Sequence, residues 1–284
     1  LHSTSKLNPY GTNQFYNGFK DEGSNGWGLR TLFGYKIDSD EFGVHLMLGG
    51  EYQRDLNALA EFDLVEGDLG DLRTSDETRS QYVQAFFKAS THVDRKLVVD
   101  GSIGLLTTLY DREDLVADST QNRDLRRHFE PVWLPKISMR YTLNEQYVVY
   151  ALASRGVSTP TLWEIQDGPD LKPERSDHFE LGVRGSLFQD LFLITLNGYS
   201  TRISDAITEQ PDSLGFSTYQ NTGAIDLRGL ESTIQFRKKH TPEQLLTDFN
   251  VGFSLGVQAY TFEDLVIGQE DFEGNEVPGV PLVN

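Results

Sequence analysis

The sequence predicts an all-β fold, in the form of an antiparallel, up-and-down transmembrane β-barrel. Apolar residues recur at every second position over long stretches, which is the periodicity of strands with one apolar face. Short and long polar connections alternate between these stretches, as they do in outer-membrane barrels. Only 38% of the residues are hydrophobic. No apolar run approaches the length of about eighteen residues that a membrane helix requires, so no transmembrane helix is predicted.

The stretch Phe249–Ala259 has the clearest pattern, with apolar residues at every odd position and small or polar residues at every even position. Its length is about that of a tilted strand that crosses a bilayer. The same alternation, weaker in some stretches, predicts about ten strands. They are Trp27–Ile37, Phe42–Tyr52, Arg79–Thr91, Leu97–Tyr110, Ile137–Tyr141, Tyr147–Ser154, Phe179–Val183, Leu191–Ile203, Leu230–Arg237 and Phe249–Ala259. In Leu191–Ile203 the apolar face is ambiguous, because apolar residues occupy both registers.

Short polar turns are predicted to join these strands in pairs, and long polar segments are predicted to separate the pairs. The short turns are Asp38–Glu41, Val93–Lys96, Leu143–Gln146, Phe188–Asp190 and Lys239–Glu243. The long segments are Asp55–Thr78, Asp111–Glu130, Arg155–Ser176 and Ser204–Asp226. Soluble sheets mix loop lengths irregularly, whereas tight periplasmic turns and long outer loops are typical of an outer-membrane barrel.

Aromatic residues lie near both ends of the predicted strands, as the two interfacial girdles of a membrane barrel would. Those near the short turns are Tyr35, Tyr141, Tyr147 and Phe249, and those near the long loops are Trp27, Tyr52, Tyr110 and Tyr260. The general preference of tyrosine for strands is an alternative explanation. The alternation also predicts a set of charged residues on the lumen face, where charges can pair: Glu180, Arg184, Glu231 and Arg237.

The formal net charge of −18 argues against nucleic-acid binding, because a binder needs basic surface to displace counterions from phosphates. Acidic residues concentrate in the predicted outer loops. There are eight acids against one arginine in Asp55–Thr78, and six acids with no base in Thr261–Glu276. Loop solvation explains this charge. Divalent-cation bridging to lipopolysaccharide, or attraction of a cationic or metal-bearing ligand, remain alternatives.

The sequence contains no catalytic constellation, so an enzyme is not predicted. The six histidines are scattered, without the HExxH pair of a zinc protease, and there is neither a GxSxG elbow nor a glycine-rich phosphate loop. His178 and Asp177 are adjacent on a predicted strand and therefore point to opposite faces. The chain has no cysteine, which excludes disulfides and thiolate metal sites. No catalytic residue, metal site or cofactor is expected.

Four motifs follow one another in the second half of the chain. They are YALASRGVSTPTLWEI at Tyr150–Ile165, LKPERSDHFELG at Leu171–Gly182, YQNTG at Tyr219–Gly223 with RGLE at Arg228–Glu231, and VPGVP at Val277–Pro281. In sequence, order and spacing they resemble stretches of the TonB-dependent outer-membrane receptors. The resemblance covers about 134–281, and the upstream strands fit it in pattern rather than in motif.

The resemblance implies a plug domain followed by a barrel of about 22 strands in the bacterial outer membrane. Residues 1–284 would be a segment of that barrel wall, with the plug domain and the final strands absent. In the first motif, Arg155 and Glu164 can pair within their loop or contact cargo.

The function that the resemblance implies is energy-coupled uptake of a scarce nutrient, with an iron–siderophore chelate as the first candidate. Alternatives are another cargo (haem, cobalamin or an oligosaccharide) or a passive, porin-like barrel. The expected partners are outer-membrane lipid and lipopolysaccharide, the TonB energy-coupling complex through the plug, and a small-molecule ligand, with no nucleic acid. Three aromatic residues of the outer loops can stack on a ligand: Trp163, Phe216 and Tyr219.

Overall fold

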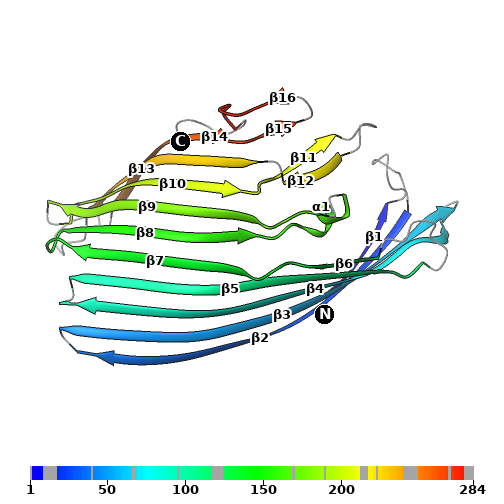
Figure 1. Ribbon diagram of the computed structural model, residues 1–284, viewed down its shortest axis with the longest axis horizontal. Coiled ribbons are helices and arrows are strands. Elements are labelled where there is room, and N and C mark those ends of the chain that lie inside the picture. Colours follow the sequence, from blue (N-terminus) through cyan, green and yellow to red (C-terminus); the bar gives the residue numbers. More distant parts are fainter. Residues whose placement is uncertain are drawn as a thin grey trace. The chain divides into compact units, whose positions relative to one another are not determined.

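The computed structural model describes residues 2–8, 18–39, 41–65, 68–94, 96–116, 124–167, 170–188, 190–211, 217–221, 223–238, 249–267 and 270–277. Most of them lie in strands (Figure 1). One sheet of 12 strands has the order β1-β2-β3-β4-β5-β7-β8-β9-β10-β13-β14, with β6 beside β5. The strand pairs β11–β12 and β15–β16 form two small separate sheets.

The strands of the large sheet are β1 (His2–Asn8), β2 (Gly18–Asp38), β3 (Phe42–Val65), β4 (Asp68–Val93), β5 (Leu97–Asp114), β6 (Leu125–His128), β7 (Val132–Thr142), β8 (Tyr147–Ser158), β9 (Glu174–Leu187), β10 (Phe192–Ser204), β13 (Ala224–Lys238) and β14 (Phe249–Phe262). The remaining elements are α1 (Leu162–Asp167), β11 (Ile207–Pro211), β12 (Ser217–Asn221), β15 (Val266–Ile267) and β16 (Glu270–Asp271). No helix in the described ranges is long and apolar enough to cross a membrane.

The chain divides into two compact units. Unit 1 comprises Leu1–Leu32, Gly49–Ala85 and Leu105–Val132, and unit 2 comprises Phe33–Leu48, Phe86–Gly104 and Trp133–Asn284. Strands β2 to β5 therefore contribute residues to both units. Unit 2 contains the whole of β8 to β14, and with them all four motifs of the sequence.

All ten predicted strands are confirmed, as β2, β3, β4, β5, β7, β8, β9, β10, β13 and β14. Their predicted ends are wrong at the long segments. Asp55–Thr78 is not a loop, because β3 continues to Val65 and β4 begins at Asp68. Two paired strands satisfy each other's backbone hydrogen bonds whatever their side chains are, so pairing continues where the apolar alternation stops. The predicted turn Lys239–Glu243 lies outside the described residues.

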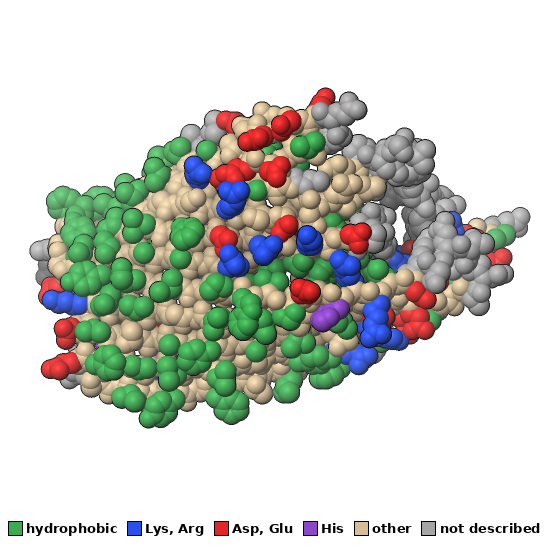
Figure 2. Space-filling view, viewed as in Figure 1, with side chains coloured by type: hydrophobic (Ala, Val, Ile, Leu, Met, Phe, Trp, Pro, Cys, Tyr) green, Lys and Arg blue, Asp and Glu red, His purple; other side chains and the backbone are tan. Residues whose placement is uncertain are grey.

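In unit 2 the large sheet has one apolar face. The odd residues of β14 from Phe249 to Val257 are exposed, and Phe253 is 64% exposed. The register forms one row across the sheet on this face. The row runs from Leu255 of β14 through Ser232 of β13, Leu196 of β10, Val183 of β9 and Val149 of β8 to Tyr141 of β7. Leu255, Leu196 and Tyr141 are exposed and the other three are half-buried, so none is packed in a second layer. Figure 2 shows hydrophobic side chains spread over this region. Hydrocarbon is the environment that matches such a face.

Aromatic rings form a ladder along the short-turn end of this face. Centroid distances are 6.0 Å for Phe188–Phe192, 5.3 Å for Phe192–Phe236 and 5.9 Å for Phe236–Phe249. Ten residue steps separate Phe249 from Ala259 on β14. With about 3.3 Å per residue and a tilt of about 40°, they span about 25 Å, the height of a lipid-facing band. Of the four residues predicted for the girdle at the short turns, Phe249 belongs to this ladder, and Tyr35 and Tyr141 are exposed.

The predicted girdle at the long loops is wrong for two of its four members. Trp27 and Tyr52 do pack together in unit 1, with ring centroids 5.1 Å apart. Tyr260 lies on the opposite, polar face of unit 2, because it is an even residue of β14. Tyr110 likewise shares its side of β5 with the buried residues Thr108 and Arg112. Proximity to a strand end does not decide which face a ring occupies.

Candidate functional site

The polar face of unit 2 carries a chain of polar side chains in contact from three neighbouring strands. Tyr150 of β8 donates to Glu180 of β9 at 3.0 Å. His178 lies 3.5 Å from Glu180 through Nε2, and its Nδ1 is 2.7 Å from the Thr201 hydroxyl on β10. As predicted, His178 and its neighbour Asp177 point to opposite faces, so they form no acid–base pair.

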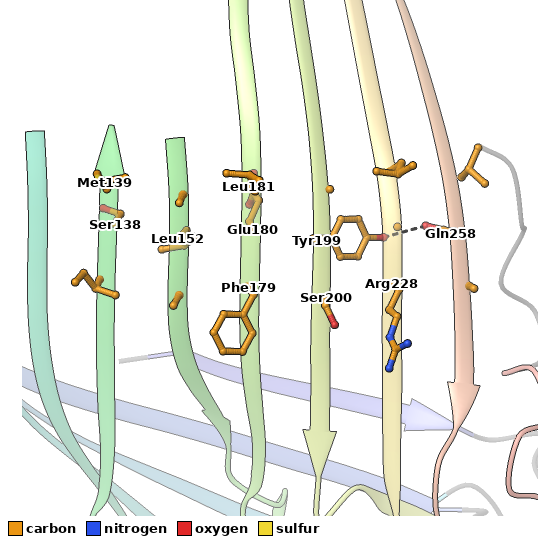
Figure 3. A pocket seen from close by; sticks show the side chains of 18 residues that line it. Ser138, Met139, Leu152, Phe179, Glu180, Leu181, Tyr199, Ser200, Arg228 and Gln258 are labelled. Atoms are coloured by element: carbon orange, nitrogen blue, oxygen red, sulfur yellow. Dashed lines mark hydrogen bonds between the residues drawn. The ribbon is translucent and has the colours of Figure 1, made fainter. Parts of the chain in front are cut away.

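A second group of polar side chains continues this face onto β13 and β14. The hydroxyls of Tyr199 and Tyr260 are 3.2 Å apart, and both contact the Gln258 amide oxygen, Tyr199 at 3.4 Å (Figure 3). Asn197 donates to Glu231 at 3.3 Å. The strand registers place the charged residues predicted for the lumen on this same face: Glu180, Arg184, Glu231 and Arg237.

The polar face of unit 2 therefore presents phenol, carboxylate, imidazole and amide groups side by side. Such groups can donate hydrogen bonds to a hydrophilic ligand and accept hydrogen bonds from it. Among the described residues no group of three or more His, Asp or Glu side chains is arranged to hold a metal ion.

Unit 1 contains a polar hollow of about 530 Å³ between β2 and β3. Gly26, Gly28 and Arg30 line it from β2, and Glu51, Gln53 and Asp55 line it from β3. Arg30 forms an ion pair with Glu51 at 2.7 Å, and the Gln53 amide donates to Asp55 at 2.9 Å. This hollow can accept a ligand that carries hydrogen-bonding groups.

The acidic stretch that begins at Asp55 is partly neutralised by arginine. Asp76 and Arg112 form a buried ion pair, with side chains 4% and 9% exposed. Arg79 pairs with Glu77 at 2.9 Å and with Glu113 at 3.4 Å. These carboxylates lie on strands rather than in a solvated loop, because Asp76 and Glu77 belong to β4 and Glu113 belongs to β5.

The long connections of unit 2 are held together by hydrogen bonds, and we call this region the loop platform (α1, Leu171–Lys172, β11, β12, Gly223 and Leu265). Asn221 of β12 accepts from the Lys172 amide at 2.7 Å and donates to the carbonyls of Lys172 at 2.9 Å and Asp205 at 2.7 Å. Glu174 accepts from the Ile207 amide at 2.8 Å. The second and third sequence motifs therefore meet in one structure.

The most deeply buried apolar side chains of unit 2 lie in and beside this platform rather than in the sheet. They are Pro160, Ile165, Leu171, Ala206 and Leu265, and Ile165 is only 1% exposed. Glu164 accepts from the Thr161 amide at 2.6 Å and so caps α1. The suggested pair of Glu164 with Arg155 is wrong, because Arg155 instead makes a two-point contact with Asp177 at 2.7 and 3.0 Å.

Two of the three aromatic ligand candidates, Trp163 and Tyr219, belong to elements of this platform. Tyr219 is half-buried on β12, opposite Glu209 in the register. Trp163 belongs to α1, but its side chain lies outside the described part of the chain, as does the whole of Phe216. A role for these three residues in ligand contact stays a prediction.

Replacing Asn221 with alanine is expected to loosen the loop platform while the sheet stays folded. The change removes three hydrogen bonds and leaves backbone groups of Lys172 and Asp205 without this partner, at a cost of about 1–3 kcal/mol. Limited proteolysis or hydrogen exchange of the full-length protein measures this opening. Asn221→Asp is the matched variant, because it keeps the acceptor for Lys172 and loses only the donors.

The β-barrel model of the TonB dependent receptor-like family matches residues 2–283 of this chain. The chain belongs to the TonB-dependent receptor β-barrel family. Members of this family are β-barrel proteins of the bacterial outer membrane, which is where this receptor chain resides. The antiparallel sheet with one apolar and one polar face is accordingly part of a barrel wall.

Solved structures of other receptors share the fold at low sequence identity. The ferric citrate transporter FecA has a TM-score of 0.72 at 12% identity, over 94% of this chain and 40% of its own. The siderophore receptor PiuA from Acinetobacter baumannii has a TM-score of 0.69 at 11% identity, over 94% of this chain and 44% of its own. The copper transporter OprC has a TM-score of 0.70 at 14% identity, over 97% of this chain and 42% of its own. The receptor chain thus spans less than half the length of these structures.

Proposed function

We propose that this chain is the wall segment of an outer-membrane receptor that takes up a scarce nutrient with energy supplied through TonB. The proposed ligand is an iron–siderophore chelate. The observation that carries it is the two-faced sheet: an apolar face suited to lipid, and a continuous polar face with paired Tyr, His and Glu side chains. The similar structures include a ferric citrate transporter and a siderophore receptor, which supports iron as the first cargo to test.

In this proposal the short turns face the periplasm and the loop platform faces the outside of the cell. The ligand binds at the loop platform and the polar face, and a plug domain in the full-length receptor contacts the TonB complex. Outer-membrane lipid and lipopolysaccharide surround the apolar face. The chain's residues bind and guide the ligand, and no bond is made or broken.

Deletion of the full-length gene is expected to abolish growth on one ferric siderophore as the sole iron source. Radiolabelled iron uptake in the presence of that siderophore measures the same loss directly. A protonophore or deletion of TonB should reduce uptake to the same level, because the step requires energy. Uptake that persists without TonB would point to a passive barrel instead, and unchanged growth on every iron source would point to another cargo.

A further inference from the structure

Basic and acidic side chains form a band on the apolar face of unit 2, at its last apolar row and directly beyond it. The register aligns Arg155 of β8, Asp177 of β9, Arg202 of β10 and Asp226 of β13 in one row across the sheet. Arg175 and Arg228 lie on the same face, two positions from Asp177 and Asp226 respectively. We call Arg155, Arg175, Arg202 and Arg228 the arginine band.

The side chains of the arginine band are exposed although each contacts a carboxylate. Arg228 is 68% exposed and pairs with Asp226 at 2.7 Å, and Arg202 is 54% exposed and pairs with Glu263. A guanidinium carries five N–H donors, so contact with one carboxylate leaves donors for a second anion. Figure 2 shows basic and acidic side chains together next to the hydrophobic region.

Asp226 and Glu263, the partners of Arg228 and Arg202, also interact with each other. Their hydrogen bond raises the pKa of Glu263 above the ordinary value of a glutamate.

A hollow in the apolar face leads to these two arginines. A groove of about 990 Å³ crosses β7 to β14, and Arg228 is one of its lining residues (Figure 3). The groove is deepest at β10, where Gly198 and Ser200 have small side chains. Their neighbours on the adjacent strands are larger: Phe179 and Leu181 on β9, and Leu230 on β13. The next residue of β10 on this face is Arg202. An apolar slot therefore ends at two cationic side chains.

We propose that Arg202 and Arg228, together with the slot at Gly198 and Ser200, bind the lipid A part of lipopolysaccharide. The arginines take a phosphate of the headgroup, and the slot takes an acyl chain. Guanidinium groups match phosphate geometry by two parallel hydrogen bonds. Among the described residues of this face, the stretch from the Phe192–Phe236–Phe249 row to Ala259 holds no charge other than Arg228, so the cationic side chains sit at the height of headgroups. This inference rests on the outward placement of the loop platform in the proposed function.

The test is a binding titration of the full-length receptor in phosphatidylcholine nanodiscs with bisphosphorylated lipid A and with its dephosphorylated form. The double variant Arg202→Ala/Arg228→Ala should weaken binding of bisphosphorylated lipid A at least about tenfold and leave the dephosphorylated lipid unaffected. Gly198→Leu should fill the slot and weaken both lipids about threefold. The variant Arg202→Lys/Arg228→Lys keeps both charges, and its loss of affinity for bisphosphorylated lipid A should be intermediate.

Arg140→Ala/Arg184→Ala is the matched control, because it removes the same charge from the polar face of the same sheet. An equal loss of lipid A binding in this control overturns the proposal, as does unchanged binding in the Arg202→Ala/Arg228→Ala variant. Complete displacement of bound lipid A by millimolar inorganic phosphate would also overturn it, since the site would then take any phosphate. Iron uptake by the same variants is measured in parallel, so that a failure of lipid binding leaves the transport proposal standing.

Discussion

Replacing Leu196 with arginine is expected to destabilise the folded receptor by about 2–4 kcal/mol. Leu196 lies near the middle of the apolar face on β10, between Val183 and Ser232, and is 47% exposed. An arginine at this depth would place its guanidinium in hydrocarbon, where it has neither water nor a counterion. Guanidinium unfolding of the full-length receptor in lipid vesicles, followed by tryptophan fluorescence, measures the change in free energy.

Asn197→Arg is the control, because it adds the same side chain one residue further along the same strand. Asn197 points to the polar face and contacts Glu231 at 3.3 Å, so an arginine there gains a partner. We expect this variant to lie within about 0.5 kcal/mol of the wild type. Equal stability of the two variants would contradict the assignment of the apolar face to lipid.

The sequence predicted the membrane-spanning part of the sheet well because the bilayer imposes a strict alternation there. Every residue on one side must suit hydrocarbon, and this rule is visible in a single strand such as Phe249–Ala259. Leu191–Ile203 was ambiguous because Leu193 occupies the polar face among apolar neighbours. Only its pairing with β9 and β13 identifies Phe192, Ile194 and Leu196 as the apolar side.

The alternation carries no information about segments beyond the bilayer, and there the sequence-based predictions fail. In Asp55–Thr78 polar residues form the arms of a long hairpin, which local composition does not distinguish from a loop. The loop platform depends on contacts such as that of Asn221 with Lys172, 49 residues away. Periodicity within one segment cannot reveal such pairs.

Only part of the candidate site could be predicted, because alternation gives the face on which a residue lies but not its contacts across strands. Alternation placed Glu180 and Glu231 on the lumen side, but it did not indicate that Tyr199 and Tyr260 would meet across three strands. Trp163 and Tyr219 are ligand candidates only because they are aromatic residues in predicted outer loops. Residue type does not determine which loop side chains face a ligand.

Replacing Gly223 with alanine is expected to disrupt the loop platform, although the change adds only one methyl group. Gly223 has a positive φ of 138°, which residues other than glycine rarely adopt. A Cβ at this position would overlap the carbonyl oxygen of Asp264. Its own carbonyl accepts from the Ala206 amide at 3.1 Å, so a shift at Gly223 also moves a buried residue. We expect a local loss of about 3 kcal/mol.

The damage should stay local, because the platform has its own buried residues while the sheet is held by strand pairing. The variant should therefore keep the folded electrophoretic mobility of the barrel, open the platform to protease, and lose ligand uptake. Gly101→Ala adds the same methyl group on β5, where nothing lies within 4 Å and φ is not positive, and it should behave like the wild type in all three measurements. If the two variants behave alike, the contact between Gly223 and Asp264 does not constrain the platform. If Gly223→Ala unfolds the whole barrel, the platform and the sheet form one cooperative unit.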